Sequence, residues 1–170
     1  MKTIKKHFYF EEDITYLNHG SFGACPKVIF EDYQNWQIKL ENQPVQFLTN
    51  ELYDALRKSR ESLSAFLGCD HDEILFFQNP TTAISNIIYN LDLKPVDEVL
   101  MTDHEYGALV RAWTVWGRKN NVMIKNAKIN LPLESKDKFF DDISKKISSK
   151  TKVLFLSHIT SPTGLVFPLK

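Results

Sequence analysis

Hydrophobic positions along the chain follow two alternating patterns. Short runs that are apolar at every position, such as "ILFF" and "VLFL", are typical of strands covered on both faces. Between them, apolar residues recur at helical spacing, as in "TTAISNIIYNL". The pattern predicts helices over most of 27–42, 51–67, 81–91, 107–119 and 136–148. It predicts strands near 74–77, 98–102, 122–128 and 152–157.

The alternation of strands and helices predicts an α/β fold with a mostly parallel sheet flanked by helices. Parallel strands need long crossover connections, and helices usually make them. In open sheets of this kind, ligands bind at the carboxyl ends of the strands. Functional residues are therefore expected just after Phe77, Met101 and Leu156.

The segment "QNPTTAISN" follows the first of these strands. Asn79 can cap a helix, Pro80 suits its first position, and the amides and hydroxyls of Thr81 and Thr82 then gather at its positive end. The segment is either a phosphate site or simply a good helix cap. The chain has neither a GxGxxG loop nor a P-loop, so a phosphate here would belong to a small ligand.

Three further segments carry candidate side chains. In "TDHEYGALVRAW", His104 and Tyr106 lie at a strand-to-helix turn, where an aromatic ring stacks on a flat heterocycle or serves in packing. In "SHITSPTG", Thr160 and Ser161 offer hydroxyls to a phenolate oxygen or to their own backbone. In "YLNHGSFGACP", two glycines beside Asn18 and His19 suit a substrate-lining loop or a plain turn.

Composition narrows the classes of partner and of cofactor. The chain has 170 residues, and 21 basic residues balance 21 acidic ones, so no net charge favours nucleic acid or an anionic membrane. Cys25 and Cys69 lie far apart, as expected of ordinary thiols in a reducing compartment. We find neither a signal peptide nor an apolar run long enough to span a membrane, which predicts a cytoplasmic protein. The five histidines lack metal-ligand spacing, so we expect no metal site, and a metal hydrolase is the weakest alternative.

Four motifs in order, "YLNHGSFGACP", "NPTTAISN", "DHEYGALVRAW" and "SHITSPTG", give the chain a family resemblance. It resembles the N-terminal part of a class V aminotransferase-type enzyme, a pyridoxal-phosphate protein of fold type I, in the isopenicillin N epimerase-like branch. The resemblance implies an incomplete large domain. It assigns residues 1–50 to an extended segment and helix on the substrate side, and 51–170 to the first half of the cofactor domain.

The same resemblance implies roles for individual residues. Thr81, Thr82 and Ala83 match positions that bind the cofactor phosphate. Tyr106 matches the aromatic residue that stacks on the pyridine ring, with His104 as the alternative, and Ser161 or Thr160 matches the donor to the pyridine 3-oxygen. Asn18, His19 and Gly20 match the segment that lines the substrate side.

The resemblance also implies that the chain is the first half of a longer enzyme. In the family, the Asp that pairs with the pyridine nitrogen and the Schiff-base lysine both come further on, and neither Lys170 nor any other lysine here matches that position. We therefore predict that this chain holds no catalytic residue and is inactive alone.

The predicted whole protein is a homodimer that acts on Cα or Cβ of an amino acid or an amine-bearing peptide-like substrate. Its reaction would be of the epimerase or aminotransferase type. Two alternatives stay open: a non-catalytic remnant that binds phosphate or dimerises, and a cysteine desulfurase-like lyase.

Overall fold

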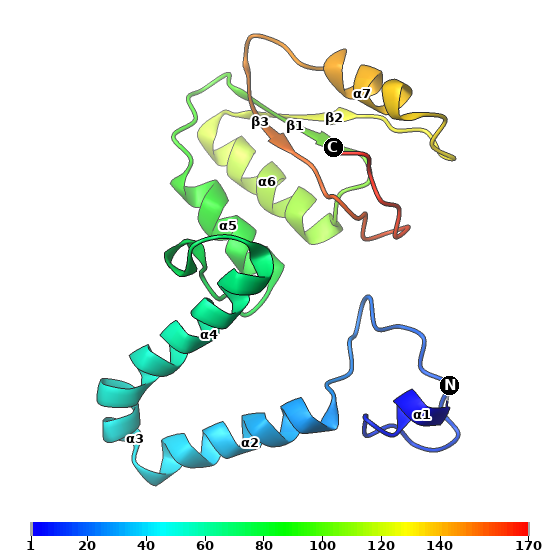
Figure 1. Ribbon diagram of the computed structural model, residues 1–170. Coiled ribbons are helices and arrows are strands. Elements are labelled where there is room, and N and C mark those ends of the chain that lie inside the picture. The colour runs from blue at the N-terminus through cyan, green and yellow to red at the C-terminus, as the bar shows by residue number, and fades with distance from the viewer. Residues whose placement is uncertain (1, 170) are drawn as a thin grey trace. The chain divides into compact units, whose positions relative to one another are not determined.

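The structure, a computed structural model, describes residues 2–169 and is drawn in Figure 1. The chain divides into two compact units, Met1–Leu75 and Phe76–Lys170. The helix that follows residue 51 contacts the segments on either side of it and belongs to the first unit. The assignment of residues 1–50 to the substrate side and of 51–170 to the cofactor domain stays a prediction.

The first unit is helical. Its elements are α1 (Lys2–Lys5), α2 (Lys27–Asn42), α3 (Pro44–Gln46), a π-helical segment η1 (Phe47–Glu51), α4 (Leu52–Leu67) and a short 3-10 helix η2 (His71–Glu73). The two long helices confirm the predictions at 27–42 and 51–67. Helix α4 ends where Gly68 adopts the left-handed conformation (φ 73°) and donates its N–H to Ser64 O at 2.8 Å.

The second unit is a three-stranded parallel sheet with helices on both faces. Its strands β1 (Glu98–Thr102), β2 (Met123–Ala127) and β3 (Thr151–Phe155) lie in the order β2-β1-β3. Its helices are α5 (Pro80–Asn90), α6 (Gly107–Asn120) and α7 (Lys136–Ser144). The predicted α/β class and parallel sheet are confirmed.

Two hydrophobic clusters cover the two faces of the sheet. Val99 and Met101 of β1 pack with Ile88 of α5 and with Trp113 and Trp116 of α6. On the opposite face, Leu100 packs with Phe139 and Ile143 of α7 and with Phe167. Alternate residues of one strand point to opposite faces, so β1 is buried on both sides. In β3, which carries most of the apolar run "VLFL", Leu154 is instead 47% exposed.

The predicted strand at 74–77 does not form. Ile74 has extended backbone angles, but no segment among residues 2–169 pairs with this run, and Leu75, Phe76 and Phe77 are exposed. A strand needs a neighbour for its hydrogen bonds, and an apolar pattern cannot supply one. Helix α7 is also shorter than predicted, because Lys146 and Ile147 donate to the carbonyl three residues back and turn the chain out of the helix.

A buried carboxylate joins the strands at their amino ends. Glu98 accepts hydrogen bonds from Ser148 Oγ at 2.6 Å, Lys125 Nζ at 3.0 Å and Thr151 Oγ1 at 3.2 Å. The Ser148 hydroxyl, and then the Lys125 ammonium, hold the pKa of this carboxyl below its ordinary value. The side chain therefore links β1 to β2 and to the start of β3.

This network predicts a loss of stability in acid. A carboxylate whose pKa is lowered by folding stabilises the fold above its unfolded pKa, and that contribution disappears as pH falls through the folded pKa. Glu98→Gln removes the charge, so we expect it to lower the melting temperature at pH 7. The gap to the wild type should close as pH falls below the ordinary value of 4.5. Thermal unfolding followed by circular dichroism from pH 7 to pH 3 measures this gap, and a constant gap would contradict the assignment.

Candidate functional site

Two segments of the second unit that carry predicted site residues lie at one edge of the sheet. The turn after β1 and the segment after β3 leave neighbouring parallel strands at their carboxyl ends. Helix α6 begins directly after the first of these segments, and α5 packs against α6 (Figure 1). This edge is where ligands of open α/β sheets bind.

The start of α5 has the features of an anion site. Asn79 caps the helix: its Oδ1 accepts from the Thr82 N–H at 2.9 Å and from the Thr82 hydroxyl at 3.0 Å. Ala83 donates its N–H to Asn79 O at 3.2 Å. The Thr81 N–H and hydroxyl have no hydrogen-bond partner among residues 2–169. These two donors at the positive end of a helix suit a phosphate.

The two candidate rings, His104 and Tyr106, differ in burial and in contacts. His104 is largely buried; its Nε2 lies 2.8 Å from Ile129 O, and its ring meets Phe167 edge-on. Tyr106 occupies the N-cap position of α6 and is 46% exposed. The Tyr106 ring is thus accessible for stacking, whereas His104 is engaged in holding the loop after β2.

The two candidate hydroxyls also differ. Thr160 is buried, and its Oγ1 lies 2.7 Å from Thr163 Oγ1 and accepts the Leu165 N–H at 3.0 Å. Ser161 is exposed, and its hydroxyl has no partner within residues 2–169. The Thr160 hydroxyl closes its own loop, which leaves Ser161 available to a ligand.

Glu105 lies in the same turn as the two candidate rings, and the sequence analysis did not single it out. It lies between the two candidate rings, yet it is only 5% exposed. Its carboxylate accepts from Thr102 Oγ1 at 2.7 Å, and from Ser157 through the hydroxyl at 2.5 Å and the N–H at 3.1 Å. The available signal was an acidic residue in the turn after one strand and serines just after another. This signal becomes usable only when the two strands are known to be neighbours.

The predicted substrate segment lies in the first unit. Asn18, His19 and Gly20 are exposed, and Asn18 O accepts the Phe22 N–H at 3.0 Å. The His19 ring meets Tyr16 edge-on at 4.9 Å and borders a pocket of about 350 Å³ within residues 4–19. The role of this segment stays a prediction.

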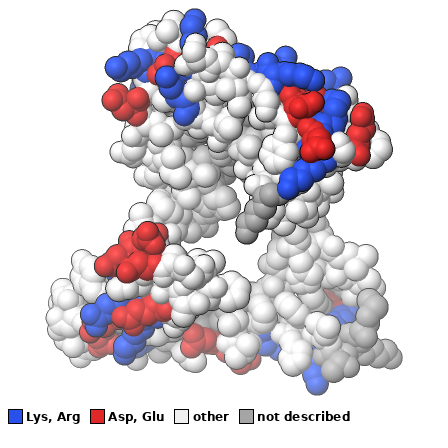
Figure 2. Space-filling model, turned by 45° about the horizontal axis from the view of Figure 1, so that its top comes forward, with Lys and Arg blue, Asp and Glu red and all other residues white. Residues whose placement is uncertain are grey.

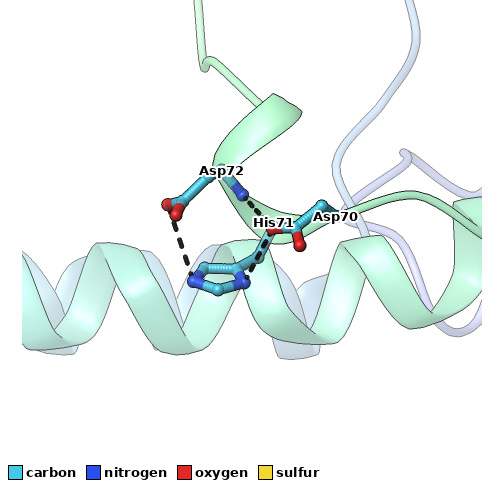
Figure 3. A group of neighbouring side chains, drawn as sticks. All are labelled: Asp70, His71 and Asp72. Carbon is cyan, nitrogen blue, oxygen red and sulfur yellow. Dashed lines mark hydrogen bonds and ion pairs between the residues drawn. The ribbon is translucent and has the colours of Figure 1, made fainter.

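A group of potential metal ligands lies at Asp70, His71 and Asp72 (Figure 3). Asp70 Oδ1 accepts the Asp72 N–H at 2.9 Å, and Glu73 Oε2 accepts the Asp70 N–H at 2.9 Å. The His71 ring lies 3.2 Å from Asp70 and 3.5 Å from Asp72. These contacts are those of a capped short helix, and nothing further in the group points to a metal.

The distribution of charge on the surface and the length of the helices bear on the predicted partners and location. On the face drawn in Figure 2, basic and acidic residues lie interspersed, in keeping with their equal numbers of 21 each. Within residues 2–169, every helix is too short or too polar to cross a membrane. The cytoplasmic location and the absence of a nucleic-acid partner stay predictions.

The chain matches one family model and is similar to several known proteins. A family model described as Aminotransferase class-V matches residues 16–170. The chain is 29% identical over 158 residues to the isopenicillin N epimerase of Amycolatopsis lactamdurans, covering 91% of this chain and 39% of that protein. It is 24% identical over 174 residues to a probable chloroplastic L-cysteine desulfhydrase of Arabidopsis thaliana, covering 94% and 37%. The chain therefore spans about two fifths of the length of these curated relatives.

Solved structures show the same fold. A mutant of C-DES with glycine covalently linked to its PLP cofactor superposes with a TM-score of 0.86 at 24% identity, covering 96% of this chain and 43% of that chain. The cysteine desulfurase CsdA of Escherichia coli gives a TM-score of 0.78 at 20% identity, covering 99% and 43%. The sheet and helices described above are thus part of the fold of these enzymes.

Proposed function

Because the chain belongs to the class V aminotransferase family, we propose that it is the N-terminal part of a pyridoxal-phosphate enzyme. The proposed substrate is an amino acid or an amine-bearing, peptide-like molecule that reacts at Cα or Cβ. The observation that carries this proposal is the start of α5, where Thr81 presents two unpaired donors, with an accessible aromatic ring at the start of the adjacent helix α6.

The residues present fit pyridoxal phosphate. Thr81 would hold the phosphate at the positive end of α5 with its N–H and hydroxyl. Thr82 and Ala83 are weaker candidates for this role because their donors already bond to Asn79. Tyr106 would cover one face of the pyridine ring, and Ser161 would donate its hydroxyl to the 3-oxygen. His104 and Thr160 are the weaker candidates for these two roles because other contacts engage their side chains.

These side chains bind and orient rather than transfer protons. When bound, pyridoxal phosphate supplies an electron sink for charge that develops at Cα. The donors at the start of α5 would hold the phosphate end of the cofactor, and Tyr106 would keep water from one face of its ring. Asn18, His19 and Gly20 would line the substrate side. We also propose that the whole protein is a homodimer.

Two reaction types are supported by relatives. An epimerase or aminotransferase reaction at Cα is favoured by the isopenicillin N epimerase relative, which is the more similar at 29% identity. A lyase reaction at Cβ is the second candidate, and the L-cysteine desulfhydrase relative and the likeness to C-DES support it. Whole protein supplied with L-cysteine separates the two, since only the lyase releases sulfide.

We further propose that residues 1–170 alone do not complete the reaction, because no lysine among them matches the family's Schiff-base position. A remnant that only binds phosphate or dimerises is the remaining alternative for this stretch. It would bind inorganic phosphate as tightly as pyridoxal phosphate.

The test is a titration of the chain with pyridoxal phosphate, in which absorbance measures binding. Borohydride is then added to trap any bond between the cofactor and a lysine. We expect reversible binding that borohydride does not trap on any single lysine. Tyr106→Ala should weaken binding about 2- to 10-fold, since an aromatic stacking contact is worth about 0.5–1.5 kcal/mol.

Tyr89→Ala is the matched control, because Tyr89 is also exposed but lies in the last turn of α5. It should leave the affinity unchanged. Equal losses in the two variants would contradict the stacking role. A stoichiometric adduct on one lysine, mapped by mass spectrometry, would show that the chain carries its own anchor.

A further inference from the structure

The turn between β1 and α6 holds both neighbouring strands through consecutive side chains. Asp103 Oδ1 accepts the Ile129 N–H at 2.9 Å, and the His104 ring donates to Ile129 O at 2.8 Å. Both contacts hold the chain after β2. The next residue, Glu105, reaches the opposite neighbour, β3, and Tyr106 then begins the helix.

Glu105 holds the segment after β3 through a single residue. Its two oxygens accept from three donors, namely the Thr102 hydroxyl, the Ser157 hydroxyl and the Ser157 N–H, which the two oxygens share. Beyond Ser157 the chain folds back on itself: Ile159 and Val166 form an antiparallel bridge, and the Phe167 N–H donates to His158 O at 2.8 Å. Ser157 therefore anchors the start of the folded segment 157–167 to the turn that carries Tyr106, while Phe167, buried against Leu100 and Phe139, anchors its end.

Glu98 provides a comparison for Glu105, because its carboxylate links strands away from the candidate site. Glu98 lies at the other end of β1, is similarly buried at 6% exposure, and also accepts a hydrogen bond from a serine hydroxyl next to β3. It lies at the amino ends of the strands, where no candidate ligand residue was found. Glu105 makes the same kind of link at the ligand-binding edge.

We propose that Glu105 is a positioning residue for the cofactor: through Ser157 it sets the place of Ser161 relative to the ring of Tyr106. Tyr106 adjoins Glu105 in the chain, and Ser161 lies on the segment that Ser157 anchors. One buried carboxylate thus fixes the donor to the 3-oxygen against the residue that covers the ring. The inference rests on the proposed function.

The test compares Glu105→Gln with Glu98→Gln in the 170-residue chain. An amide retains one acceptor oxygen and cannot accept at its nitrogen, so each variant loses part of one network. For Glu105→Gln we expect faster amide hydrogen exchange at 157–165 and about 3- to 10-fold weaker binding of pyridoxal phosphate, because the ligand must then order the segment itself. Binding of inorganic phosphate should not change, since its donors lie on α5.

Glu98→Gln is the matched control, since it breaks a similar network in the same strand. It should speed exchange at 148–151 and keep the affinity for pyridoxal phosphate within about twofold of the wild type. If the role of Glu105 were only structural, the two variants would lower that affinity alike, in proportion to their loss of melting temperature. Ser157→Ala removes the hydroxyl contact and keeps the N–H contacts, so it should give a smaller loss in the same direction and replaces Glu105→Gln if that variant does not fold.

The outcomes separate the inference from the proposed function. A wild-type chain that does not bind pyridoxal phosphate contradicts the proposed function. Wild-type binding that Glu105→Gln and Ser157→Ala both leave unchanged overturns the inference alone. Unchanged exchange at 157–165 in Glu105→Gln also overturns it, whatever the ligand affinity.

Discussion

Replacing Trp113 by alanine is expected to lower the free energy of unfolding of residues 76–170 by about 3–5 kcal/mol. Trp113 is 1% exposed and packs in the cluster between the sheet and helices α5 and α6. Its ring lies 5.7 Å from the Phe155 ring and 6.0 Å from the Trp116 ring. Truncation leaves a large cavity in a domain whose total stability is of the order of 5–15 kcal/mol. Urea denaturation followed by far-ultraviolet circular dichroism measures the change.

Trp113→Phe is the control for this prediction. The indole Nε1 is buried without a hydrogen-bond partner among residues 2–169, so phenylalanine sacrifices no hydrogen bond and retains most of the ring packing. We expect it to cost less than half as much as alanine. A phenylalanine variant as unstable as the alanine variant would show that the volume of the ring is not what stabilises this cluster.

Gly117→Ala is expected to be the next most harmful change, with a net loss of about 1–2 kcal/mol. Gly117 lies on the face of α6 that meets the start of β2. A Cβ there would lie 2.9 Å from both Val122 O and Ile124 Cγ1. Alanine normally stabilises a helix interior by about 1 kcal/mol relative to glycine, so a loss would reveal the contact. The same denaturation assay measures it.

Gly107→Ala provides the comparison within the same helix. A Cβ at this position would meet only Arg111 Nη1, at 3.9 Å. We expect stability to stay the same or to rise by about 0.5–1 kcal/mol. If both glycine variants gained stability, the close approach of α6 to β2 would be wrong.

Local sequence patterns correctly predicted strands whose pairing partners lie among the described residues. The predicted strand at 98–102 forms, with β2 on one side and β3 on the other. The run at 74–77 is the more apolar of the two but has no partner among the described residues. Strand propensity is local, whereas pairing depends on what else is present, so the pattern alone could not separate these two cases.

The candidate site was predictable to the extent that it depends on helix starts and turns. Asn79 and Pro80 indicate the start of α5, and the family resemblance adds Tyr106 and Ser161. The role of Glu105 depends on Ser157, which lies 52 positions further along the chain. Such a contact follows only from strand order. The different surroundings of Thr160 and Ser161 likewise depend on how their loop closes.

The turn at 103–106 has a consequence for how the length of this chain can vary in evolution. Asp103 and His104 attach to one neighbouring strand end and Glu105 to the other, so each attachment depends on the number of residues that precede it. Deleting one residue would bring each remaining side chain to the place of its neighbour, and inserting one would turn α6 by about 100° about its axis. Both changes detach the two strand ends together. Substitutions in this turn act one contact at a time, whereas a change of its length acts on every contact at once.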